Sequence, residues 1–181
     1  MSVAAPQGCQ VRSALVGDLE AMRQLYTHHV LHGTSSFEVV PPQAEEFAQR
    51  FHASRSNGLP WMVAESEGRL LGFAYAASYR PRPAYRFTVE DSVYVEPAAQ
   101  GRGVGRALLS MVIEGATAAG KRQMVAVVGD SANRPSIILH QKLGFRLVGT
   151  FTNVGFKFGR WLDSVLLQRE LGEGAGSVPE G

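Results

Sequence analysis

The chain has 181 residues, 45% of them hydrophobic and 19% charged, a composition typical of a globular protein rather than a disordered one. Its 18 basic residues nearly balance 16 acidic ones, so the net charge of +2 gives no sign of a nucleic-acid partner. A single cysteine excludes an intrachain disulfide and a cysteine-rich zinc site, and no apolar run reaches the ~18–20 residues of a membrane span. We therefore expect a cytoplasmic protein that needs no metal and no membrane.

The length fits one domain, which we expect over residues 10–171. Residues 1–9 are expected to form a flexible N-terminal tail. Glycine and acidic residues dominate residues 172–181, which we expect to be a disordered C-terminal tail.

Between these tails, helical and alternating apolar patterns follow one another. The first half predicts a strand over 10–14, a helix from about Leu19 to Gly33, a helix over 43–56 and a hairpin of strands over 61–65 and 70–77. Two prolines keep residues 79–84 in an extended loop, and a long strand is expected over 85–95.

The second half begins with a helix over 104–119 and a buried strand over 123–128. A helix that ends at Leu143 follows, and then strands over 146–151 and 164–171, joined by a connection over 153–163. The whole order, β-α-α-β-β-β-α-β-α-β-β, is typical of a mixed α+β protein.

The segment after the 85–95 strand carries the most specific pattern in the chain. It reads Gln100-Gly101-Arg102-Gly103-Val104-Gly105-Arg106 and opens directly into an apolar-periodic helix. Glycines let successive backbone N–H groups converge on one point, and a helix start adds partial positive charge. The loop therefore predicts a seat for a phosphate or diphosphate.

Other phosphate loops fit this segment less well. The mononucleotide loop needs Gly-x-x-x-x-Gly-Lys-Ser/Thr, which is absent. A dinucleotide loop needs a third glycine where Arg106 stands, and an acidic residue where Lys121 and Arg122 lie. A tight turn that binds nothing is the remaining alternative, but such a turn does not require two arginines around three glycines.

The loop resembles the Gln/Arg-x-x-Gly-x-Gly/Ala motif of the GCN5-related N-acetyltransferase (GNAT) superfamily, and Asn133 followed by Leu143-Gly144-Phe145 resembles its second motif. The resemblance implies a central, mostly antiparallel twisted sheet of about seven strands flanked by about four helices. It also implies acetyl-CoA as co-substrate, with its diphosphate on the loop and its pantetheine arm along the preceding strand. The residues implied for acetyl-CoA are Val93, Tyr94, Val95, Gln100, Gly101, Arg102, Gly103, Val104, Gly105, Arg106, Asn133, Ser136 and Lys142.

Residues 60–65, 85–95 and 154–163 resemble more closely the phosphinothricin and methionine sulfoximine acetyltransferases. This resemblance implies acetylation of the α-amine of a small amino-acid analogue, such as methionine sulfoximine, methionine sulfone or phosphinothricin, by a homodimer. Acetylation of another amine, such as a protein N-terminus, and a coenzyme A sensor without catalysis stay open as alternatives.

The transfer needs a base, because a primary amine is protonated at neutral pH. Alternation on the 85–95 strand separates Glu90 from Asp91, Val93 and Val95, so Glu90 should face the more polar side of the sheet. The resemblance places a catalytic glutamate at Glu90. Asp91 is its local rival, since a bulge would exchange their faces.

His140 stands near the position where the superfamily often has a tyrosine that returns a proton to the leaving thiolate, so it is the second catalytic candidate, against a purely packed or solvated histidine. The acceptor should carry a carboxylate and a second polar end, which arginine binds well. The substrate-binding candidates are Phe37, Arg80, Arg82, Tyr85, Arg86 and Lys157.

Overall fold

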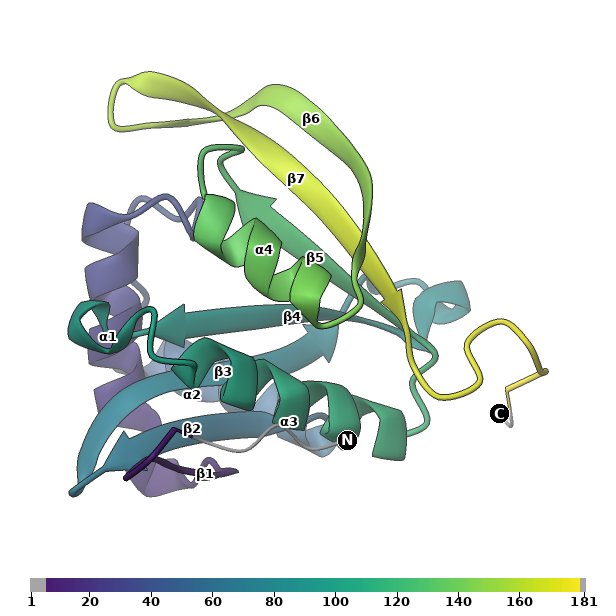
Figure 1. The fold of residues 1–181 in the computed structure, drawn as a ribbon, viewed down its shortest axis with the longest axis horizontal. Helices are drawn as coiled ribbons and strands as arrows, with labels where there is room; N and C mark the ends of the chain where they lie inside the picture. Colours follow the sequence, from purple (N-terminus) through teal and green to yellow (C-terminus); the bar gives the residue numbers. More distant parts are fainter. Residues whose placement is uncertain (1–5, 180–181) are drawn as a thin grey trace.

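A computed structural model describes residues 6–179; residues 1–5 of the expected N-terminal tail and 180–181 of the expected C-terminal tail lie outside them. Seven strands form one sheet in the order β1-β2-β3-β4-β5-β7-β6. The β4–β5 pair is parallel and every other pair is antiparallel. Figure 1 shows this twisted sheet with its helices. The mixed α+β fold and the order of its elements are confirmed.

The elements have the following bounds: β1 Gln10–Ser13, α1 Leu19–His32, α2 Ala44–Ser56, β2 Trp61–Ser66, β3 Arg69–Ser78, β4 Thr88–Val95, α3 Val104–Ala118, β5 Gln123–Gly129, α4 Arg134–Lys142, β6 Arg146–Lys157 and β7 Arg160–Glu170. One-turn 3-10 helices at Val16–Asp18, Pro83–Tyr85 and Pro97–Ala99 join some of them.

Two predicted boundaries are wrong. β4 begins at Thr88 rather than at residue 85, because the prolines lead into a 3-10 turn over Pro83–Tyr85. The predicted connection over 153–163 is instead the tip of a long β6–β7 hairpin. Phe158 and Gly159 close that hairpin with φ values of +51° and +72°, the left-handed conformations that a two-residue hairpin turn requires.

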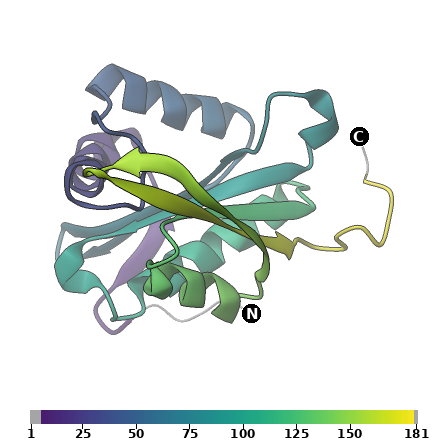
Figure 2. The same cartoon turned by 90° about the horizontal axis from the view of Figure 1, so that it is seen from above.

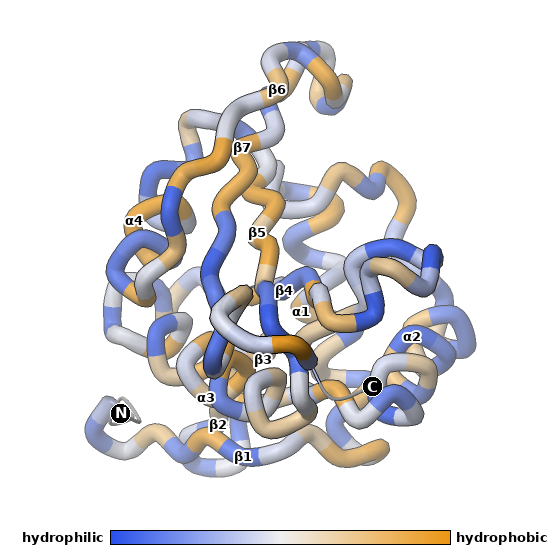
Figure 3. Tube along the Cα trace, turned by 90° about the vertical axis from the view of Figure 1, so that its right-hand side faces the viewer, coloured by the Kyte–Doolittle hydropathy of each residue, from blue (hydrophilic) through white to orange (hydrophobic). Residues whose placement is uncertain are grey.

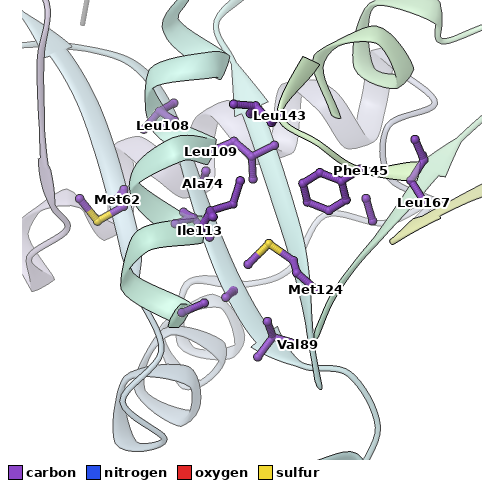
Figure 4. Close-up of a cluster of buried hydrophobic side chains, with 14 of the residues drawn as sticks. Met62, Ala74, Val89, Leu108, Leu109, Ile113, Met124, Leu143, Phe145 and Leu167 are labelled. Carbon is purple, nitrogen blue, oxygen red and sulfur yellow. The ribbon is translucent and has the colours of Figure 1, made fainter. Parts of the chain in front are cut away.

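Two hydrophobic clusters cover the two faces of the sheet. On one face α3 and α4 pack over β2–β5 and β7, with Leu108 and Leu109 of α3 fully buried (Figure 4). On the other face α1 and α2 pack around an aromatic cluster that includes Trp61, Phe73 and Tyr94. Figure 2 shows α2 on one side of the sheet and α3 and α4 on the other. The strands β2, β3 and β4 therefore contribute side chains to both clusters.

The chain leaves the sheet at the end of β7 (Figure 1). After β7, Leu171 is buried, and residues 172–179 follow as a series of turns in which Glu173 pairs with Arg122 at 3.3 Å. No helix among residues 6–179 is long and apolar enough to cross a membrane.

The β6–β7 hairpin extends beyond the body of the molecule, as the tube at the top of Figure 3 shows. Its side chains include exposed apolar groups where a hairpin in water would normally carry polar ones. Towards the tip these are Phe151, Val154, Phe156, Phe158 and Trp161, and near the start of β6 they are Leu147 and Val148, each more than half exposed.

Candidate active site

β4 and β5 run side by side only over their first halves. Their pairing extends from Thr88 with Gln123 to Asp91 with Ala126, and each strand then continues without the other. The strands therefore open into a cleft whose walls are the ends of β4 and β5 and the start of α4. The cleft is lined by Ser35, Asp91, Ser92, Val93, Tyr94, Ala126, Val127, Val128, Gly129, Asn133, Ser136 and His140. An extended ligand can lie against β4 there as an added strand would.

The glycine loop leads from the end of β4 into α3. Gly101 and Gly103 have φ values of +72° and +87°, which glycine adopts without strain. Gly103 is the N-cap of α3, and no side chain caps the helix there. The first backbone N–H groups of α3 therefore have no side-chain acceptor, and the exposed Arg102 and Arg106 lie in the same segment. Free amides, the helix dipole and two guanidinium groups suit a diphosphate.

Gly105 brings the start of α3 close to the cleft. A Cβ atom added at Gly105 would lie 3.4 Å from a methyl carbon of Leu139 on α4 and 3.4 Å from one of Val95 on β4. A larger side chain would push the helix away from both. That Cβ would also lie 3.9 Å from a methyl carbon of Val93, which lines the cleft, so the loop adjoins the cleft as a ligand with a diphosphate at one end of an extended arm would require. That geometry suits acetyl-CoA.

The backbone carbonyl of Val95 is a shared acceptor at the outer end of β4. His29 Nε2 donates to it at 3.0 Å, and Gln100 Nε2 lies 3.4 Å from it. Burial lowers the pKa of His29, and the hydrogen bond to Val95 partly opposes this. Tyr94 turns its ring away from the cleft into the aromatic cluster. Of the predicted strand residues, Tyr94 is thus positioned to contact a ligand in the cleft only through its backbone.

Glu90 and Asp91 lie on opposite faces of β4. The pairing of β4 with β3 and β5 continues without a bulge through both residues, so the alternation holds. Glu90 shares its face with Ser92 and with Tyr75 on β3, towards α1 and α2. Its pKa is raised by burial first and by the charge of Asp91 second, while Arg80 lowers it. A carboxylate in this setting is a stronger base than an exposed one.

Asp91 faces α4 and pairs with His140. His140 Nε2 lies 3.0 Å from Asp91 Oδ2, and His140 Nδ1 lies 2.7 Å from the carbonyl oxygen of Ser136. Burial alone would lower the pKa of His140, but the charge of Asp91 and the two hydrogen bonds outweigh burial and raise it. His140 therefore lines the cleft as part of a pair rather than as a lone histidine.

Asn133 and Ser136 stand together at the start of α4. The Asn133 side chain accepts the backbone N–H of Ser136 and caps the helix, and both residues line the cleft. Lys142 is exposed in the last turn of the same helix.

The predicted acceptor residues lie on the loop that precedes Glu90. Arg80 stacks over the rings of Tyr79 and Tyr85 at 5.0 and 5.7 Å, and its charge reaches Glu90. Arg82 and Arg86 are exposed, and Arg86 lies over Phe87 at 4.4 Å. Of the three arginines, the structure therefore ties Arg80 to Glu90.

Phe37 and Lys157 join the loop after α1 to the β6–β7 hairpin. The Phe37 ring lies directly against Gly155, where an added Cβ would be 2.4 Å from it, so only glycine leaves room. Lys157 Nζ donates to the carbonyl oxygens of Gly33 and Ser36 at 2.9 and 2.7 Å. The ammonium group of Lys157 is thus occupied by the backbone, and its contact with a substrate stays a prediction.

Sequence reasoning did not identify the contact of His29 with β4 or the pairing of Asp91 with His140. The helical spacing of His29 marks it as buried on α1, but its partner lies 66 residues away. Among residues 6–179 no group of three or more His, Cys, Asp or Glu side chains is arranged to hold a metal ion.

Comparison with known proteins supports the family resemblance. The family model for the acetyltransferase (GNAT) domain matches residues 11–166. The chain is 51% identical over 172 residues to phosphinothricin N-acetyltransferase of Alcaligenes faecalis, covering 95% of this chain and 87% of that protein. It is 39% identical over 165 residues to L-methionine sulfoximine/L-methionine sulfone acetyltransferase of Salmonella typhimurium, covering 91% and 96%.

A solved structure gives the same result. The crystal structure of a GNAT superfamily phosphinothricin acetyltransferase from Sinorhizobium meliloti in complex with AcCoA superposes with a TM-score of 0.92 at 45% identity, covering 96% of this chain and 94% of that one. Sequence motifs, fold and comparisons agree. The chain is therefore an acetyltransferase of the GNAT family.

Proposed function

We propose that this enzyme transfers the acetyl group of acetyl-CoA to the α-amino group of a small amino-acid analogue of the methionine sulfoximine, methionine sulfone or phosphinothricin type. One observation carries the proposal: a half-buried carboxylate, Glu90, lies one residue before the last β4–β5 pair, and the charge of Arg80 on the preceding loop acts on it. The names of the relatives in Alcaligenes faecalis and Salmonella typhimurium support the substrate class.

The proposed roles of the residues in binding acetyl-CoA and in proton transfer are the following. Bound acetyl-CoA supplies the thioester carbonyl that the amine attacks. The amides and arginines of residues 101–106 hold its diphosphate, and the backbone of Val93–Val95 holds the arm in the cleft. Glu90 takes the proton from the substrate ammonium, and its raised pKa makes it a better base than an ordinary glutamate.

The acceptor is held by groups on the other side of Glu90. Arg80, whose guanidinium lies over the ring of Tyr85, is proposed to bind the carboxylate of the amino acid. Arg82 and Arg86 are exposed on the same loop and are proposed to bind the polar sulfoximine, sulfone or phosphinate end. Phe37 and Lys157 complete the wall formed by the loop after α1.

We further propose that the enzyme is a cytoplasmic homodimer. The five exposed apolar side chains towards the tip of the β6–β7 hairpin form a surface that a second copy would cover. The cytoplasmic location follows from the need for the cellular pool of acetyl-CoA.

A thiol-release assay with acetyl-CoA tests the reaction and its acceptor. We expect turnover with L-methionine sulfoximine, L-methionine sulfone and L-phosphinothricin, and none with the N-acetylated form of the best of them. Faster turnover with a peptide bearing a free N-terminus would assign a protein N-terminus as the acceptor. Tight coenzyme binding without turnover on any amine would leave a coenzyme A sensor.

A further inference from the structure

Asp91 is a buried carboxylate in apolar surroundings. It is 6% exposed, and its cross-strand neighbours are Ala76 on β3 and Ala126 on β5. Val89 and Val93 lie two residues away on the same face of β4. An ionised carboxylate in such a place costs several kcal/mol unless a partner compensates it. The surroundings therefore require a partner for Asp91.

His140 is that partner, and its contacts define its protonation. Its Nε2 faces a carboxylate oxygen of Asp91 at 3.0 Å, and its Nδ1 faces the Ser136 carbonyl oxygen at 2.7 Å. Both oxygens accept hydrogen bonds, so only a ring that carries a proton on each nitrogen satisfies both. The two side chains are 3% and 1% exposed, so little water reaches the bond between them. The geometry therefore favours the imidazolium form of His140.

The other elements around the pair bring few charges. Ala126 and Val128 of β5 line the same cleft, and the ring of Phe145 meets His140 edge-on at 5.0 Å. Glu90 lies on the opposite face of β4, where its carboxyl feels the charge of Asp91. Oδ1 of Asp91 is buried and receives no hydrogen bond from residues 6–179. Among residues 6–179, His140 is therefore the side chain that compensates the charge of Asp91.

We propose that Asp91 is a positioning residue for acetyl transfer: it holds His140 as an imidazolium in the cleft wall, and the Nε2 proton passes from its hydrogen bond with Asp91 to the departing thiolate. This proposal rests on the function proposed above. As the bond between amine nitrogen and carbonyl carbon forms, the carbon–sulfur bond breaks and its electron pair stays on sulfur. The Nε2 proton then gives the thiol.

The protons balance over the cycle. The substrate ammonium gives up two protons in becoming an amide; the first passes through Glu90, and both reach solvent. A solvent proton returns to Nε2, because a neutral His140 would leave a lone pair facing the ionised Asp91. The Ser136 carbonyl keeps the other proton on Nδ1, so Nε2 is the site that exchanges. The net release is one proton.

The first test needs no turnover. In protein carrying ¹⁵N-labelled histidine and no coenzyme, the ring nitrogens of His140 should report a doubly protonated ring at pH 7, and Asp91→Asn should move the titration to lower pH. A neutral ring at pH 7 in the natural protein, or an unchanged titration in Asp91→Asn, would overturn the proposal. Asp91→Ser serves if Asp91→Asn does not fold. Because the acceptor is absent, this result stands apart from the fate of the proposed function.

The second test uses kcat as a function of pH. Asp91→Asn should lower kcat about tenfold or more and move the basic limb of the profile to lower pH, with the KM for acetyl-CoA little changed. The double variant with His140→Gln should be no slower than His140→Gln alone. Losses that multiply, or a basic limb that does not move, would show that Asp91 only stabilises the fold. Asp18→Asn, whose carboxylate pairs with Arg12 outside the cleft, is the matched control.

Discussion

At the scale of single residues, the site depends on two adjacent carboxylates that the pleat of one strand assigns to different tasks. Glu90 lies on the face of α1 and α2, where the charge of Arg80 acts on it, and Asp91 faces α4 and His140. The alternation of β4 predicts this separation from sequence, and the absence of a bulge preserves it. The pairing of Asp91 with His140 was not predictable, because it joins residues 49 positions apart whose approach depends on how α4 packs on the sheet.

Replacing Glu90 by Gln keeps the shape of the side chain and removes the base. We expect kcat to fall by about 10²-fold or more, because the ammonium must then lose its proton to solvent. Calorimetric titration should show the affinity for acetyl-CoA nearly unchanged. A kcat within about twofold of the natural value would assign the proton transfer to another group.

The raised pKa of Glu90 also predicts how stability depends on pH. Burial of Glu90 on folding favours its protonated form. Between the ordinary pKa of 4.5 and the raised pKa, the folded chain therefore binds more protons than the unfolded chain. Its contribution to the free energy of unfolding is therefore lost as pH rises through that window. Urea unfolding should show the natural protein losing stability relative to Glu90→Gln across it. A difference that stays constant, or grows in favour of the natural protein, would contradict the burial of this carboxyl.

At the scale of elements, the glycine loop and α3 act as one unit. The loop was predictable because its glycines allow backbone conformations that other residues rarely adopt, and their spacing is visible in the sequence. The long β6–β7 hairpin was not. The register of its strands shifts between Phe151 and Gly155, which breaks the alternation of side chains. The Phe37 ring also occupies the space that a side chain at residue 155 would need, so the sequence has glycine there.

Two glycines at opposite ends of α3 offer a matched test of the loop. Gly101 and Gly120 have φ values of +72° and +75°, and an added Cβ meets nothing within 4 Å at either. Alanine should strain both positions alike, by about 1 kcal/mol. Only Gly101→Ala should weaken acetyl-CoA binding, by roughly tenfold or more, because it disturbs amides that hold a charged ligand. Equal affinities in the two variants would remove the diphosphate from this loop.

At the scale of the whole molecule, the order of elements and the mixed sheet were predictable, since apolar periodicity marks each core element. Which helices cover which face was not, because the sequence does not report the packing that α1 and α2 share around Trp61 and Tyr94. The exposed face of the hairpin appears only once its strands are known to extend to residues 157 and 160.

That face predicts the oligomeric state. Phe156 and Trp161 are both 59% exposed and contact each other with ring centroids 5.3 Å apart. Replacing both by Ser should convert a dimer to a monomer in sedimentation velocity, because the apolar area that joins the copies is lost. Val16→Ser, at an apolar residue that is 63% exposed and lies outside the hairpin, should leave the dimer intact. A natural protein that sediments as a monomer at micromolar concentration would refute the dimer.

The central claim is that the amides around residues 101–106 hold a diphosphate while the arm of the same molecule lies along the end of β4. Titrating acetyl-CoA into ¹⁵N-labelled protein tests it directly. The amide resonances of Gly101, Gly103 and Gly105 should shift together with those of Val93 and Val95 and saturate at one ligand per chain. Shifts confined to other residues, or no saturable shift at all, would contradict the account.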